Sequence, residues 1–124
     1  MKAYKGESPI TIRFRRKSIT NRPDLCRLMA DVYIRETRKR FYFNLPGYFL
    51  PQELDKLDTQ GRIKDPRDYN DKALIHTSSR IFDWQLIAAT AFSALERSGV
   101  AVKDFTKKEM DVAIKAAQRK EGEL

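Results

Sequence analysis

Arginine, tyrosine and asparagine side chains recur at alternate positions in three short segments of the first 45 residues. The residues concerned are Arg13, Arg15, Arg27, Tyr33, Arg35, Arg40, Tyr42 and Asn44. A guanidinium fork suits a phosphate or a guanine edge, an asparagine amide suits adenine, and tyrosine can contact a phosphate or the thymine methyl group. These residue types could therefore read duplex DNA, provided that one surface presents them together.

Three segments of alternating polarity would place these side chains on one surface. In residues 9–15, 26–35 and 40–45, apolar residues alternate with polar ones. A period of two is typical of half-buried β-strands, whose successive side chains point to opposite faces. If the three strands pair as an antiparallel meander, one face is apolar and the other carries the basic and aromatic side chains. Asp31 falls on that second face.

The charge distribution separates the predicted sheet from the rest of the chain. The formal net charge is +8. Residues 1–45 contain 12 Lys and Arg but only four Asp and Glu, whereas the remaining residues contain 13 of each. The whole excess therefore lies in the predicted sheet and its loops, as expected for a binder of polyanions.

The later residues predict a crossover and two helices. Residues 46–68 are rich in turn signals and are expected to form an ordered crossover, with one short helix, that covers one end of the sheet. A long helix is predicted over about 69–98, with Leu74, Ile81 and Phe92 on its apolar face and either Leu86 or Trp84 between them.

A shorter helix is predicted over about 107–118. Thr106 and Glu109 have the spacing of a capping box, and Phe105 and Met110 that of a hydrophobic staple. Strands followed by helices indicate an α+β fold, here one domain over residues 1–124. Residues 1–8 are predicted to be a flexible arm, and residues 119–124 a polar tail or linker.

The inventory of reactive side chains argues against an enzyme. The chain has one cysteine, Cys26, expected as a buried thiol, and one histidine, His76, expected on a helix surface. No cluster suits a metal, and no glycine-rich loop suits a phosphate cofactor. Three aspartates, Asp65, Asp68 and Asp71, are read as capping residues at a helix start. We predict no catalytic residue, metal or cofactor.

No stretch approaches the roughly 20 apolar residues that would cross a membrane. The amino terminus lacks the apolar segment of a secretion signal. A single cysteine cannot form an internal disulfide, so we expect a cytoplasmic protein without membrane contact.

Two functions from different classes follow from these patterns. In the first, the sheet binds the major groove of double-stranded DNA, and further basic residues flank the groove: Lys17, Arg22, Arg38 and Lys39. In the second, the chain is a protein-interaction or self-association module that docks through the sheet or the long helix. For any single residue the ordinary interpretation is cross-strand pairing, as Asp31 with a neighbouring arginine; the set as a whole favours DNA.

The chain also resembles a known family through motifs spread over about residues 9–118. These motifs are Asp31-Val-Tyr-Ile-Arg-Glu-Thr-Arg-Lys-Arg-Phe-Tyr-Phe-Asn-Leu45, Leu50-Pro-Gln-Glu-Leu-Asp55, Gly61-Arg-Ile-Lys64, Asn70 with Leu74, and Phe105-Thr106. They resemble the amino-terminal arm-type DNA-binding domain of tyrosine recombinases, the integrases of phages and conjugative transposons, especially the Bacteroides type. The resemblance implies a three-stranded sheet that binds arm-type DNA sites during site-specific recombination. It also implies a non-catalytic module, followed in such integrases by core-binding and catalytic domains.

Overall fold

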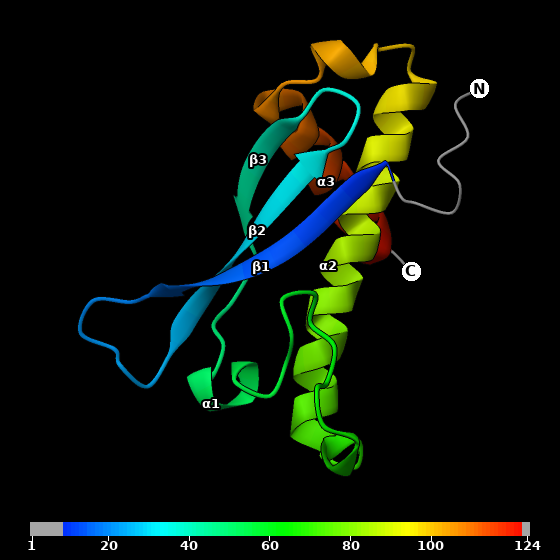
Figure 1. Cartoon of the computed structure of the whole chain (residues 1–124). Coiled ribbons are helices and arrows are strands. Elements are labelled where there is room, and N and C mark those ends of the chain that lie inside the picture. The colour runs from blue at the N-terminus through cyan, green and yellow to red at the C-terminus, as the bar shows by residue number, and fades with distance from the viewer. Residues whose placement is uncertain (1–8, 123–124) are drawn as a thin grey trace.

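The alternating segments form a three-stranded antiparallel sheet in the computed structural model, which describes residues 9–122 and the side chains of residues 9–119. The strands are β1 (Ile10–Ser18), β2 (Cys26–Ile34) and β3 (Lys39–Asn44), in the order β1-β2-β3. The predicted meander is therefore confirmed (Figure 1). The predicted arm, residues 1–8, lies outside the described residues.

The inner face of the sheet is apolar, as the period of two predicted. Ala30, Val32 and Ile34 of β2 are fully buried, and Cys26 is buried as well. Strand β1 continues to Ser18, beyond its predicted end at Arg15, because its last residues pair with the start of β2. Backbone pairing extends a strand even where the apolar alternation has stopped.

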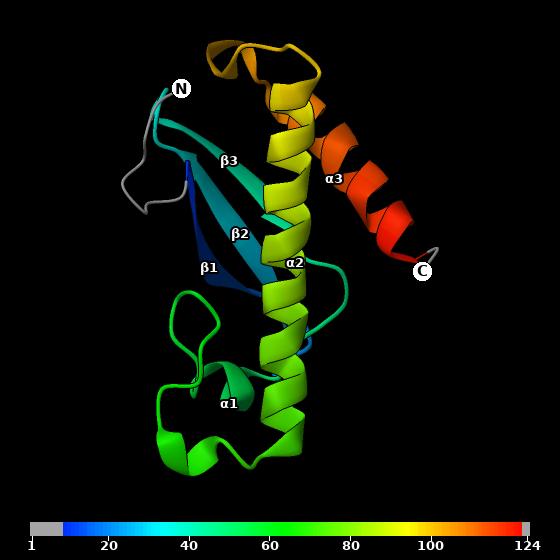
Figure 2. The same ribbon diagram turned by 90° about the vertical axis from the view of Figure 1, so that its right-hand side faces the viewer.

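Two helices cover the inner face. Helix α2 (Lys72–Arg97) crosses the sheet, and α3 (Lys107–Gly122) packs beside α2 after the short 3-10 helix η2 (Val102–Asp104) (Figures 1 and 2). Trp84 is the central residue of this layer, with its ring 6.2 Å from that of Phe14 and 6.0 Å from that of Phe43. Leu86, the alternative to Trp84 in the sequence pattern, is 60% exposed on the opposite side of α2.

The helix signals are largely confirmed. Asp71 caps α2 by accepting a hydrogen bond from the backbone N–H of Leu74, at 3.2 Å. Thr106 caps α3 by accepting from the backbone N–H of Glu109, also at 3.2 Å. Helix α3 runs to Gly122, so residues 119–122 are helical where a polar tail was predicted.

The crossover closes one end of the core. It contains α1 (Pro51–Leu54) and the 3-10 helix η1 (Pro66–Asp68), with Leu54 and Leu57 buried. Gly61 lies so close to α2 that an added Cβ would approach Ile81 Cγ2 to 2.5 Å, and its φ of +87° also favours glycine. Over residues 9–122, no helix has the length and apolarity to cross a membrane.

Candidate nucleic-acid interface

The antiparallel register arranges the outward side chains of the three strands in rows. We call this surface the outer face, and its rows are Thr11–Tyr33–Arg40, Arg13–Asp31–Tyr42 and Arg15–Met29–Asn44, followed by the pair Lys17–Arg27. None of the described helices covers it (Figures 1 and 2). Seven of the eight predicted contact residues lie in these rows. The eighth, Arg35, follows β2 and lines a hollow beside the first two rows.

Aromatic rings support two of the outer-face arginines. The guanidinium carbon of Arg40 lies 4.8 Å from the centre of the Tyr33 ring. That of Arg27 lies 5.3 Å from the Tyr48 ring, which belongs to the crossover and was not predicted as a site residue. Cation–π stacking restricts where a long side chain points, so these rings help to fix the guanidinium groups of Arg40 and Arg27 on the outer face.

Asp31 is the exception on this basic surface. It is the single acid among the strand residues of the outer face, yet only 1% of its surface is exposed. Its Oδ2 accepts from Arg40 at 2.9 Å and lies 3.7 Å from Arg15. The pairing with arginine that the sequence suggested is thus present, but the burial of the carboxylate was not predicted.

The four predicted flanking residues do not all lie beside the outer face. Lys17 does, at the end of β1. Arg38 is exposed in the β2–β3 turn, in the left-handed conformation with φ of 59°. Lys39 lies on the other side of the sheet, where its Nζ donates to the carbonyl oxygens of Lys103 and Phe105 at 2.7 and 3.3 Å. It therefore ties β3 to the segment before α3 and does not flank the outer face.

Arg22, the fourth, is paired within its own loop. Its guanidinium donates twice to Asp24, at 3.2 Å each. This hydrogen-bonded pair raises the pKa of Arg22 and lowers the pKa of Asp24. Both groups are exposed, so the pair can open to admit a phosphate at little cost.

Lysines of α3 add to the basic surface at the β3 edge. Lys107 and Lys115 line a hollow together with Arg27, Tyr42 and Asn44 of the outer face. Lys115 is paired there with Asp111, which lies 3.1 Å away. No local pattern predicts their participation, because α3 is brought beside β3 only by the packing of the whole chain.

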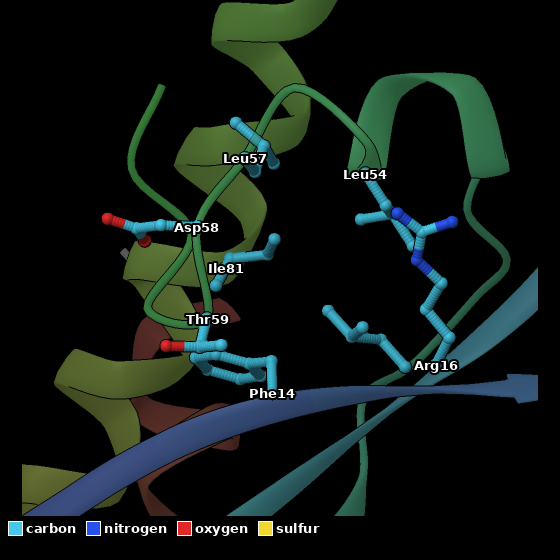
Figure 3. A pocket seen from close by; sticks show the side chains of 8 residues that line it. Phe14, Arg16, Leu54, Leu57, Asp58, Thr59 and Ile81 are labelled. Carbon is cyan, nitrogen blue, oxygen red and sulfur yellow. The ribbon is translucent and has the colours of Figure 1, made fainter. Parts of the chain in front are cut away.

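A third hollow lies on the inner side of the sheet and differs in character from the other two. It is lined mainly by apolar side chains of β1, the crossover and α2, with Arg16 and Asp58 at its margin (Figure 3). Its volume of about 170 Å³ is below the roughly 300 Å³ at which small-molecule sites begin. The Arg16 guanidinium is paired with Asp55. We interpret this hollow as a packing feature between the crossover and β1.

The other reactive side chains that the sequence analysis singled out have structural roles. Burial raises the pKa of the Cys26 thiol, which faces the carbonyl oxygen of Phe49. Among the described residues, no three His, Cys, Asp or Glu side chains gather as ligands for a metal ion. Asp65 caps η1 and pairs with Arg67, as expected of a capping residue.

Comparison with known proteins adds no relative. No protein-family model matches the chain, and neither the curated proteins nor the solved structures include a match.

Proposed function

We propose that this chain is a non-catalytic DNA-binding module that sets the outer face of its sheet into the major groove. The observation that carries the proposal is the gathering of Arg13, Arg15, Arg27 and Arg40, with Asn44, on one uncovered face of a rigid sheet. The resemblance to the arm-type domain of integrases leads to the same proposal. In that setting the partner is double-stranded DNA in the cytoplasm, and the module acts beside covalently linked core-binding and catalytic domains.

The dimensions of the sheet suit the groove. Three strands at about 4.8 Å spacing are nearly 10 Å across, close to the roughly 12 Å width of the major groove. Alternate residues such as Arg13 and Arg15 are about 6.8 Å apart along a strand, which is roughly the rise of two base pairs. One strand can therefore present successive arginines to base pairs two steps apart.

The inner layer supports this use of the outer face. Every second residue of β2 is anchored in the core, from Cys26 to Ile34, and Trp84 of α2 packs behind both β1 and β3. A reader of base edges must hold its side chains within fractions of an ångström, which a backed sheet does better than a loop.

Salt-dependent binding to duplex DNA tests the proposal. For the intact chain, the logarithm of the association constant should fall linearly and steeply with the logarithm of salt concentration, because bound counterions are released. Arg15→Ala should weaken binding by about 1 kcal/mol or more. Lys72→Ala, which removes an exposed charge at the start of α2, is the matched control and should leave affinity nearly unchanged. Absence of binding at low salt would refute the function.

Self-association through α2 is a second candidate, favoured by a separate observation. Ile75, Phe82 and Leu86 lie on one side of α2 and are 41%, 41% and 60% exposed. Their spacings of seven and four place them on one stripe of the helix. A second copy of the chain is the proposed occupant. Sedimentation equilibrium should then show a dimer that Phe82→Lys converts to a monomer; a monomeric wild type at high concentration would refute it.

A further inference from the structure

One oxygen of the buried Asp31 carboxylate is left without a partner. Oδ2 accepts from Arg40 and lies near Arg15, but Oδ1 has no hydrogen-bond partner among the described residues, although it is fully buried. A buried acceptor that is left unpaired costs folding free energy. Holding the arginines in place requires only Oδ2, so this role does not account for Oδ1.

The position of Asp31 limits what could reach it. It lies in the middle strand and middle row of the outer face, between Arg13 and Tyr42. It also lines the hollow of about 300 Å³ whose other walls are Thr11, Arg13, Tyr33, Arg35 and Arg40. The side chains above it, Arg15 and Arg40, are 65% and 51% exposed. Arg15, which lies 3.7 Å from Oδ2, can swing toward DNA and uncover the carboxylate, while Arg40 keeps its 2.9 Å hydrogen bond to Oδ2.

Most groups on DNA would be repelled by this oxygen. Phosphates, the O6 and N7 of guanine and the O4 of thymine are all acceptors. The major groove offers hydrogen-bond donors only at the exocyclic amino groups of cytosine (N4) and adenine (N6). An acidic acceptor in the centre of a basic surface therefore favours cytosine and adenine, which carry an amino group in the major groove, over guanine and thymine.

We propose that Asp31 is a specificity-determining residue, whose Oδ1 accepts a hydrogen bond from the amino group of a cytosine or adenine in the major groove. Its Oδ2 meanwhile holds Arg40 beside it, and Arg40 is suited to guanine at the same or the neighbouring base pair. This inference rests on the proposed function and adds to it a base class at one position of the site.

The test is a selection from a randomised duplex library with wild-type protein and Asp31→Asn. The amide oxygen of Asn must accept from Arg40, so its NH₂ group would occupy the place of Oδ1 and act as a donor. The wild type should select cytosine or adenine at one position, and Asp31→Asn should move that preference toward guanine or thymine. Asp83→Asn makes the same charge change at an exposed position of α2, away from the outer face, and is the matched control.

Base analogues test the same hydrogen bond by changing the DNA and leaving the protein unchanged. In the selected duplex, the amino base is replaced by its analogue without the amino group, 2-pyrimidinone for cytosine or purine for adenine. Wild-type binding should weaken about tenfold, and Asp31→Asn binding should change little.

The outcomes distinguish this inference from the proposed function. A wild type that selects a motif which Asp31→Asn reproduces unchanged would overturn the role of Asp31 and leave DNA binding intact. Equal loss of preference at every position, with unchanged thermal unfolding, would show that Asp31 only positions the arginines. If the wild type binds no duplex at all, both proposals fail.

Discussion

The two faces of the sheet are built from the same strands but are stabilised in different ways. On the inner face, Ala30, Val32 and Ile34 are fully buried in the apolar core and need no specific hydrogen-bond partner. On the outer face, the neighbouring residue Asp31 is just as buried, but it is covered by the side chains of Arg15 and Arg40. Packing thus closes one face and ion pairing the other. Substitutions on the inner face should change stability, whereas those on the outer face should change binding.

Neighbouring aromatic residues of β3 give the largest expected contrast. Phe43 is buried against Trp84, whereas Tyr42 is 42% exposed on the outer face. Phe43→Ala should lower the free energy of unfolding by about 3–5 kcal/mol, and Tyr42→Ala by less than about 1 kcal/mol. Urea denaturation measures both, and similar losses would remove the distinction between the faces.

A second neighbouring pair makes the same comparison for DNA affinity. Arg40 points to the outer face, and Lys39 donates to carbonyl oxygens on the inner side. Arg40→Ala should weaken duplex binding by about 1–3 kcal/mol, since a fork suited to a base edge is removed. Lys39→Ala should leave affinity almost unchanged while it loosens the segment before α3. Fluorescence anisotropy on one duplex compares them; an equal loss for both would indicate unspecific attraction to total charge.

A smaller effect is expected from acid, at the end of the core that the crossover closes. Burial acts to raise the pKa of Asp58, but hydrogen bonds from the backbones of Arg62 and Gln60 and the ion pair with Arg62 outweigh it, so the pKa is lowered from its ordinary 3.8. A lowered pKa contributes stability that is complete above the unfolded-state value and is lost as pH falls below it. Asp58→Asn should therefore reduce stability at pH 7 and make the remaining stability less sensitive to acid between about pH 5 and pH 2.

Urea midpoints at several pH values measure this difference. The aromatic substitution Tyr42→Ala on the outer face serves as the comparison, since it leaves the Asp58 pair untouched. If the wild type and Asp58→Asn lose stability in parallel on acidification, the hydrogen bonds to Asp58 do not contribute.

The fold was predictable because its signals are local. Alternation defined three strands, and caps at Asp71 and Thr106 marked two helix starts. The choice between Trp84 and Leu86 stayed open in the sequence, because both positions fit a helical stripe. It is decided by the rings of Phe14 and Phe43, which come from distant strands.

The arrangement of the candidate site was only partly predictable. A period of two says to which face a residue points, and it placed seven of the eight contact residues in the outer-face rows. The same period does not say which side chains from other strands or segments surround a given residue. The burial of Asp31 requires Arg15 and Arg40 from two other strands, and the hydrogen bonds of Lys39 require the segment before α3.

Mapping the bound surface by NMR tests the central claim most directly. On titration with duplex DNA at low salt, we predict that backbone amide shifts change along β1, β2 and β3 and at the β3 edge. The amides around Ile75, Phe82 and Leu86 on the exposed side of α2 should stay unchanged. Shifts concentrated on that side of α2, or no shifts at all, would contradict the account.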